Sequence, residues 1–381
     1  MNLRTIPIFL AFLLMGVADA MGPMSDAVKD RFHLTAVMAT LMPFFVFIAF
    51  AIFSVPGGVL AARIGKKKVL LLGLGLNTLA VAVPALMEPA YPLLLACIFL
   101  LGVGTTFLQV AGNPIMRDVS AAGDYSRNLA LAQGFKGIGS ASSAFLPSVI
   151  GGIALLAALG WRGAFPIFLV LMAIALVFVA MTPIHETKAD VPPNIVSSLG
   201  LLSNPTFALA VLGIFLYVGA EVCMATFLKP TLAGLGFSGS NAALFGPSLF
   251  FGCITIGRLV AGTIKINPHL FFRFSAFLGL VGLLLMMSGV QSLALGGVVL
   301  GAFGFANIWP MLFSITVEEK PERASELSGL MCMAISGGAI VPLLMGRLVD
   351  NGLKGFAFVV PAACFAYLLL LSLKGAKKKA A

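Results

Sequence analysis

The sequence predicts an all-α integral membrane protein with twelve transmembrane helices in two parallel six-helix pseudo-repeats. The 381 residues are 60% hydrophobic and 10% charged, with a mean hydropathy of +1.07, whereas soluble domains carry roughly 25% charged residues. Apolar runs recur from end to end, and each has the roughly 20 residues that cross a bilayer as a helix. These runs must be helical because backbone amides in lipid have no water to bond. An internal repeat supports the division into halves.

The apolar runs are separated by charged or Pro/Gly-rich breaks, which give two sets of six predicted helices. The first set lies near residues 6–26, 36–62, 68–87, 91–117, 127–157 and 162–181, and the second lies near 205–230, 239–264, 268–289, 292–317, 324–351 and 355–374. The longest polar break begins at His185. We therefore predict an N-terminal bundle over 1–184, a cytoplasmic linker over 185–203 and a C-terminal bundle over 204–381.

The net charge of +10 is interpreted through the placement of Lys and Arg, which sets the orientation of membrane helices. With a cytoplasmic N-terminus, sixteen of the 24 basic residues fall in inside segments and six in outside segments, while Lys136 and Arg258 fall within helices. This imbalance predicts a multi-pass protein of a bacterial-type inner membrane with both termini in the cytoplasm. It gives no reason to expect a nucleic-acid partner.

The sequence carries no motif for a metal, a cofactor or ATP. All five cysteines lie in apolar segments without Cys/His spacing, and there is no GxxxxGK[ST] loop or HExxH motif. We expect buried thiols, no metal and no cofactor. No pairing of a nucleophile with a base suggests an enzyme.

The two halves repeat short motifs in the same order. Gly-Val-Ala-Asp at 16–19 matches Val-Gly-Ala-Glu at 218–221, so Asp19 corresponds to Glu221. Further along, Asn113-Pro114 corresponds to Asn307 with Pro310. Six spans return the chain to its starting face, so the repeats are expected to be parallel.

The loop after the second predicted helix reads Gly-Val-Leu-Ala-Ala-Arg-Ile-Gly-Lys-Lys-Lys at 58–68. Together with twelve helices in parallel halves, it resembles the major facilitator superfamily, whose loop motif has a glycine, a small spacer, an acid, an arginine, a glycine and basic residues. Ala62 stands in the place of the acid. The sequence therefore lacks the acid with which this motif usually makes a charge lock to a neighbouring helix.

Within the superfamily, several segments are similar to the fucose, galactose and glucose:proton symporter branch. They are Gly-Val-Ala-Asp at 16–19, Gln-Val-Ala-Gly-Asn-Pro at 109–114, Gly-Phe-Ala-Asn-Ile-Trp-Pro at 304–310, Ser-Gly-Leu-Met at 328–331 and Ser-Gly-Gly-Ala at 336–339. Fucose-type members carry a glutamate just before the Asn-Pro of helix 4. This chain has Gln109 there, and an amide takes up no proton at physiological pH.

Four ionisable residues fall inside predicted spans, where each costs about 2.5 to 3.5 kcal/mol unless it has a partner or faces water. They are Asp19, Lys136, Glu221 and Arg258. The resemblance places Asp19 and Glu221 on helices that line the central cavity, so we expect them to couple proton uptake to transport. The alternative is a fixed ion pair, Asp19 with Lys136 or Glu221 with Arg258.

Polar residues at helical spacing mark the expected substrate site. Amides offer donors and acceptors to sugar hydroxyls, and an indole offers a flat apolar plate to a pyranose. The predicted substrate-binding residues are Gln109, Asn113, Gln133, Lys136, Asn307 and Trp309. The predicted structural or gating charges are Arg63, Arg117 and Arg258. The alternatives are polar contacts between helices for the amides and an interfacial anchor for the tryptophan.

We therefore expect a secondary transporter that moves a small polar solute, a monosaccharide by resemblance, by proton symport with alternating access. Its expected partners are the sugar, the proton and the bilayer, and it is expected to function as a monomer. Two alternatives stay open at this point. One is a proton-coupled exporter of hydrophobic compounds, and the other is an uncoupled sugar facilitator, which Gln109 favours.

Overall fold

The computed structural model describes residues 5–19, 28–142, 150, 152–187, 193–353 and 356–377, and every regular element in these ranges is helical. In the first half of the chain the helices include α1 (Ile6–Asp19), α3 (Ala36–Ile64), α4 (Lys66–Leu86), α5 (Tyr91–Val119), α6 (Tyr125–Ser142), α8 (Ala154–Ala157), α9 (Ala164–Met181) and α10 (Ile195–Gly200). In the second half they include α11 (Pro205–Gly234), α12 (Gly239–Ala243), α13 (Leu249–Ala261), α14 (Pro268–Met286), α15 (Gln291–Ala306), α16 (Ile308–Glu318), α17 (Ala324–Met333), α18 (Gly337–Asp350) and α19 (Val359–Lys377).

Ten helical segments within the described ranges are long and apolar enough to cross a membrane. They are Leu41–Ile64, Lys66–Leu86, Tyr91–Val119, Gly160–Met181, Pro205–Gly234, Gly239–Ala261, Pro268–Met286, Gln291–Glu318, Pro321–Asp350 and Phe356–Lys374. The shorter α1 and α6 occupy the places of the first and fifth predicted helices. The rest of the first predicted helix falls on residues 20–26, outside the described ranges. The rest of the fifth covers 143–157, of which 143–149 and 151 lie outside the described ranges, and the helix predicted there is broken at Ile153, which is extended before α8. The predicted all-α membrane fold is confirmed.

Asn-Pro pairs begin two of the long helices in the second half. The Asn204 side chain accepts from the amide of Thr206 at 2.9 Å, and the Asn267 side chain accepts from the amide of His269 at 2.9 Å. The proline that follows each asparagine sits in the first helical turn, where its missing N–H leaves no bond unmade. Residue type thus fixes where α11 and α14 begin.

Three predicted spans are interrupted, although the sequence pattern suggested continuous helices over 239–264, 292–317 and 324–351. The first contains a π-helical stretch at Leu244–Ser248, with Pro247 inside it. The second breaks at Asn307, where φ is −114° and ψ is 4°, three residues before Pro310. The third passes through a 3-10 turn at Ala334–Ser336. Proline explains the first two interruptions because it lacks the N–H that the helical ladder needs.

The chain forms two compact units. Unit 1 contains Met1–Ala122, Phe135–Leu199 and Pro321–Met333, and unit 2 contains Gly123–Gly134, Gly200–Lys320 and Ala334–Ala381. Each unit thus includes a short segment from the other half of the sequence. The domain boundaries expected from the sequence, with a linker over 185–203, stay a prediction.

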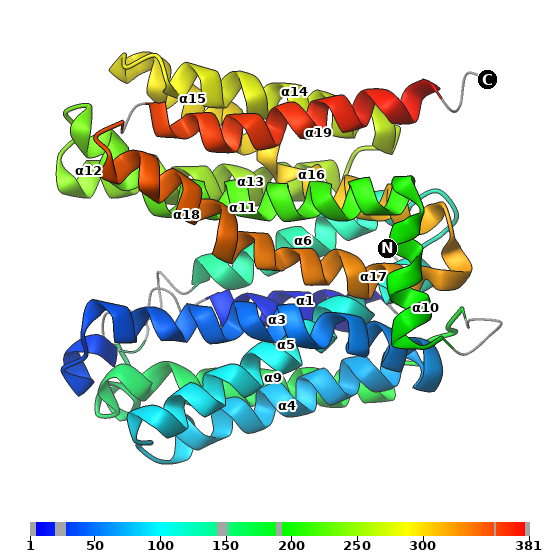
Figure 1. Ribbon diagram of the computed structural model, residues 1–381. Coiled ribbons are helices and arrows are strands. Elements are labelled where there is room, and N and C mark those ends of the chain that lie inside the picture. Colours follow the sequence, from blue (N-terminus) through cyan, green and yellow to red (C-terminus); the bar gives the residue numbers. More distant parts are fainter. Residues whose placement is uncertain are drawn as a thin grey trace. The chain divides into compact units, whose positions relative to one another are not determined.

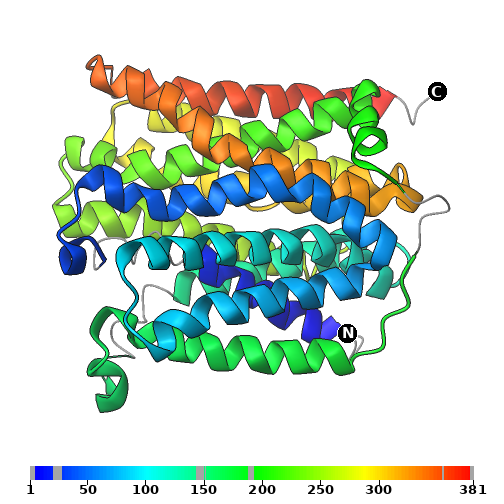
Figure 2. The same cartoon turned by 60° about the horizontal axis from the view of Figure 1, so that its bottom comes forward.

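Glycine lets helices cross closely in both units. In unit 1, α4 lies beside α5 (Figure 1, with the same pair seen from another side in Figure 2), and a Cβ on Gly73 would lie 2.7 Å from the carbonyl oxygen of Gly104. In unit 2, α14 lies beside α15, and a Cβ on Gly297 would lie 2.6 Å from the carbonyl oxygen of Gly282. Small residues allow this approach, which drives helix association in lipid. The same device at both pairs fits the predicted internal repeat.

We expect Gly104→Ala to destabilise the protein because the added methyl group would overlap the Asn77 side chain and the Gly73 carbonyl oxygen. Overpacking of this kind costs about 1 to 3 kcal/mol. The matched control is Gly75→Ala on α4, where an added methyl group meets nothing within 4 Å. A lower thermal unfolding midpoint in the first variant alone is the expected result, and equal midpoints would contradict a tight α4–α5 crossing.

Candidate transport site

One face of α5 carries Gln109, Asn113 and Arg117 on successive turns, as their spacing predicts. Gln109 is 1% exposed and Asn113 is fully buried, whereas Arg117 is half-buried. The Asn113 side-chain amide lies 3.9 Å from the sulfur of Cys332 on α17. The Gln109 Oε1 atom is buried without a hydrogen-bond partner in the part of the chain that the structure describes.

The backbone of α5 also presents a carbonyl that has no helical donor. Pro114 lacks an N–H, so the carbonyl of Val110 cannot receive the usual helical bond from the residue four positions later. The hydroxyl of Ser328 on α17 donates to this carbonyl at 2.7 Å. Two residues one turn apart on α17, Ser328 and Cys332, therefore contact the same part of α5.

Lys136 lies on α6 where α1 crosses it. A Cβ on Gly16 of α1 would lie 2.6 Å from the carbonyl oxygen of Lys136, and the rings of Phe9 and Phe135 stack at 5.1 Å. Asp19 ends α1 one turn after Gly16, but its side chain lies outside the described residues. Its predicted proton-coupling role and its alternative pairing with Lys136 both stay predictions.

In unit 2, the break between α15 and α16 is held by α13. Pro310 leaves the carbonyl of Ala306 without a helical donor, and Arg258 Nε donates to that carbonyl at 3.0 Å. The Asn307 amide donates to the carbonyl of Gly257 at 3.3 Å. Two consecutive residues of α13 thus bind two consecutive residues at the break.

Glu221 forms an ion pair with Arg258. Arg258 donates to the Glu221 carboxylate at 3.3 Å and to the Tyr217 hydroxyl at 3.1 Å, and that hydroxyl donates to the same carboxylate oxygen at 3.1 Å. The Arg258 side chain is 10% exposed and that of Glu221 is 21% exposed. The fixed pair that the sequence offered as an alternative is therefore present in this structure. A proton-coupling role for Glu221 stays a prediction.

Asn307 and Trp309 are also buried, and each keeps one polar atom unpaired. Asn307 Oδ1 and Trp309 Nε1 have no hydrogen-bond partner among the described residues. The Trp309 ring stacks on Phe313 at 5.8 Å and is 4% exposed, so it does not reach a lipid interface as an anchor must. Gln133 is buried as well, next to Gly134, whose added Cβ would meet Leu259 of α13.

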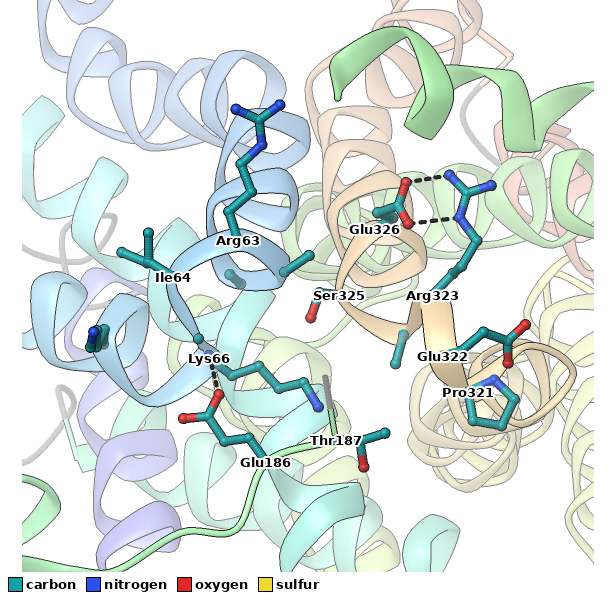
Figure 3. A pocket seen from close by; sticks show the side chains of 15 residues that line it. Arg63, Ile64, Lys66, Glu186, Thr187, Pro321, Glu322, Arg323, Ser325 and Glu326 are labelled. Carbon is teal, nitrogen blue, oxygen red and sulfur yellow. Dashed lines mark hydrogen bonds and ion pairs between the residues drawn. The ribbon is translucent and has the colours of Figure 1, made fainter. Parts of the chain in front are cut away.

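A cavity of about 420 Å³ lies in unit 1 at the turn between α3 and α4 (Figure 3). Charged side chains line it, and none of the six predicted substrate-binding residues does. Lys66 pairs with Asp118 at 2.5 Å, and the Glu186 carboxylate accepts from the backbone amides of Lys66 and Lys67 at 2.5 and 3.0 Å. Both carboxylates bind the first residues of α4. This end of α4 follows Ala62, the residue that stands where the superfamily motif has an acid.

Arg323 and Glu326 form a second charged pair in this cavity, at the start of α17. Glu326 is 2% exposed and also accepts from the hydroxyl of Ser198 on α10 at 2.8 Å. The predicted gating charge Arg63 is exposed, and its Nε donates to the carbonyl of Pro193 at 2.7 Å. Before the stretch 188–192, Glu186 and Thr187 therefore bind α4 and α5, and after it Pro193 and Ser198 bind α3 and α17.

Sequence reasoning missed Asp118, Glu186 and Glu326 as members of this charged network. Glu326 had a signal, because an acid three residues after Arg323 at a helix start predicts a local ion pair. Glu186 had none, because a carboxylate in a polar stretch resembles any solvated loop residue. Within the described ranges, no group of three or more His, Cys, Asp or Glu side chains is placed to hold a metal ion.

Comparison with known proteins extends these observations. The family model of the Major Facilitator Superfamily matches residues 8–342. A glucose/galactose transporter of Brucella abortus is 31% identical over 92% of this chain and 88% of its own length. An L-fucose-proton symporter of Escherichia coli is 24% identical over 90% of this chain and 86% of its own length.

Solved structures have the same fold. A crystal structure of the Escherichia coli fucose:proton symporter FucP superimposes with a TM-score of 0.83 at 21% identity, covering 97% of this chain and 98% of that one. The proton:xylose symporter XylE superimposes with a TM-score of 0.75 at 14% identity, covering 97% of this chain and 94% of that one. The membrane helices, the family match and the relatives agree that this chain is a transporter and belongs to the Major Facilitator Superfamily.

Proposed function

We propose that this chain is a secondary active transporter that moves a monosaccharide by proton symport. One observation carries the proposal: three of the predicted binding residues, Gln109, Asn307 and Trp309, each keep a buried polar atom without a partner among the described residues. An unpaired buried polar atom costs about 1 to 3 kcal/mol. Two acceptors and one donor match hydroxyl groups, which both donate and accept. A hydroxyl-rich solute would remove this cost when it binds.

The relatives support a hexose as the solute. The Brucella abortus protein named a glucose/galactose transporter matches nearly the whole chain, and the Escherichia coli relative is named an L-fucose-proton symporter. We propose that Asn113, Gln133 and Lys136 complete the binding set with the three residues above. The amide groups would bind hydroxyls, and the Trp309 ring would lie against the apolar face of the sugar.

We propose Asp19 as the principal proton-coupling residue and Glu221 as a second one. Gln109 carries no titrating proton, and Glu221 already shares its charge with Arg258 at 3.3 Å. Asp19 lies on α1, which crosses α6 at Lys136. The proposal includes a bacterial inner membrane, cytoplasmic termini and a functional monomer.

An uncoupled sugar facilitator is the second candidate, and Gln109 in place of an acid favours it. Export of hydrophobic compounds fits less well. An apolar solute would give no hydrogen bond to Gln109 Oε1, Asn307 Oδ1 or Trp309 Nε1. The free-energy cost of burying these polar atoms would then remain, whereas a polar solute would remove it.

We expect proteoliposomes containing the chain to accumulate at least one of D-glucose, D-galactose and L-fucose above the outside concentration when a proton gradient is imposed. The measurement is uptake of each labelled sugar with and without the gradient, alongside amphipathic drugs and empty vesicles. Uptake that only equilibrates, with no response to a protonophore, would identify a facilitator. Drug transport without sugar transport would overturn the proposal.

We expect Asp19→Asn to abolish accumulation against a gradient while sparing exchange of sugar across the membrane. The amide cannot take up the proton, but the site can still bind and release sugar. Glu221→Gln is the comparison variant and is expected to keep more of the accumulation because its partner Arg258 retains two other bonds. Uphill uptake unchanged in Asp19→Asn would reject the coupling role.

We expect Gln109→Leu and Trp309→Phe to weaken sugar binding by about tenfold, and Gln109→Leu to do so without lowering the thermal unfolding midpoint. Each variant removes a buried polar atom that has no hydrogen-bond partner among the described residues, so no hydrogen bond of that part of the chain is lost while the sugar loses one. Ser275→Ala on α14 is the control, because the Ser275 hydroxyl is equally buried and unpaired but lies outside the proposed binding set. Equal effects of all three variants on affinity would contradict the assignment.

A further inference from the structure

The structure assigns positioning roles to Arg258 and Ser328: we propose that each supplies the hydrogen bond that a proline removes and thereby orients the binding residues beside that proline. The inference rests on the proposed function only for its link to sugar affinity. Its structural basis is a pair of corresponding prolines, Pro114 in the first half and Pro310 in the second.

The two freed carbonyls are treated alike, although the donors differ. Val110 precedes Pro114 by four residues and accepts from Ser328 at 2.7 Å, and Ala306 precedes Pro310 by four residues and accepts from Arg258 at 3.0 Å. One donor is a neutral hydroxyl and the other is a guanidinium, and each comes from a different helix. Both repeats therefore have a side-chain donor from another helix at the freed carbonyl, but the donor residues are of different types.

Two other prolines inside helices lack this feature. Pro84 in α4 and Pro230 in α11 free the carbonyls of Ala80 and Thr226, and neither carbonyl accepts from a side chain among the described residues. Capture thus distinguishes Pro114 and Pro310, the two prolines that neighbour proposed binding residues.

The turns from Val110 to Pro114 and from Ala306 to Pro310 contain proposed binding residues. Asn113 lies between Val110 and Pro114, while Asn307 and Trp309 lie between Ala306 and Pro310. A proline lets its helix bend because the bond to the fourth preceding carbonyl is missing. A donor from another helix restrains that bend, and with it the direction of the side chains in the turn.

The same helix that supplies each donor also contacts the asparagine beside the freed carbonyl: α17 contacts Asn113 and α13 contacts Asn307. Ser328 and Cys332 of α17 contact Val110 and Asn113, and Arg258 and its neighbour Gly257 of α13 bind Ala306 and Asn307. At the second turn, the Asn307 nitrogen is used by the protein and Oδ1 is left unpaired. This arrangement presents an acceptor atom to a ligand.

A rescue experiment separates positioning from general stability. Ser328→Ala leaves the Val110 carbonyl without a donor, and Pro114→Ala returns the N–H of the helix to it. We expect Ser328→Ala to weaken the binding of D-galactose, D-glucose or L-fucose, whichever the purified chain binds most tightly, by about tenfold. In the Pro114→Ala background the same change is expected to cost less than about twofold.

The same four proteins are compared by thermal unfolding of the full chain. Ser328→Ala should lower the midpoint by about 2 °C, and the loss should shrink in the Pro114→Ala background. The control is Thr106→Val, which removes a buried hydroxyl bond on α5 to the Gly102 carbonyl, where no proline intervenes. Its effect should be the same with and without Pro114.

Arg258 is tested by the corresponding cycle, with Arg258→Met and Pro310→Ala in a Glu221→Gln background, so that no carboxylate is left unpaired. If this set does not fold, the Ser328 cycle decides. Effects of Ser328→Ala that are equal in both proline backgrounds would overturn the inference. A wild-type chain that binds none of the three sugars would overturn the proposed function, and the unfolding cycle would still decide whether the hydroxyl replaces the missing bond.

Discussion

The backbone hydrogen bond is the interaction on which the rest of the structure depends. In hydrocarbon, backbone N–H and C=O groups find their partners inside the protein, so long apolar runs form helices and an interruption leaves groups that need another partner. The break at Asn307 shows how this works. Proline removes one donor, Arg258 replaces it, and the residues between the two are held in a turn that a regular helix would not contain.

Buried charge follows the same logic at higher cost. An ion without a partner in a membrane interior is expensive, and the chain pairs Arg258 with Glu221 and Lys66 with Asp118. The Arg258 guanidinium also donates to the Ala306 carbonyl. It therefore both neutralises the Glu221 carboxylate and replaces the donor that Pro310 lacks. Removing Glu221 and removing Arg258 are therefore unequal perturbations, because only the second leaves a carboxylate without its ion-pair partner and the Ala306 carbonyl without its side-chain donor.

The sequence predicted the membrane fold because hydropathy and helix length are properties of continuous segments. It also placed Gln109, Asn113 and Arg117 on one face of α5, since the period of the helix fixes that relation. It did not predict the break at Asn307, because a helix can also pass a proline unbroken, as α5 does at Pro114. Nor did it predict Ser328 as a donor to Val110, because their sequence positions carry no sign that α17 packs on α5.

The composition of the α17 contact bears on how a carrier of this superfamily can move. α17 belongs to the second half of the sequence but packs on α3 and α5 within unit 1. A Cβ on Gly58 of α3 would lie 2.6 Å from the carbonyl oxygen of Ser325, and a Cβ on Gly329 would lie 2.8 Å from that of Ser54.

At these two points, the contact between α3 and α17 consists of glycine and backbone atoms. Alternating access rocks one half against the other, and α3 and α17 come from different halves of the sequence. Separating large apolar side chains would expose them to entering water at about 25 cal/mol per Å². Glycine and serine surfaces expose mostly polar backbone, which water can bond.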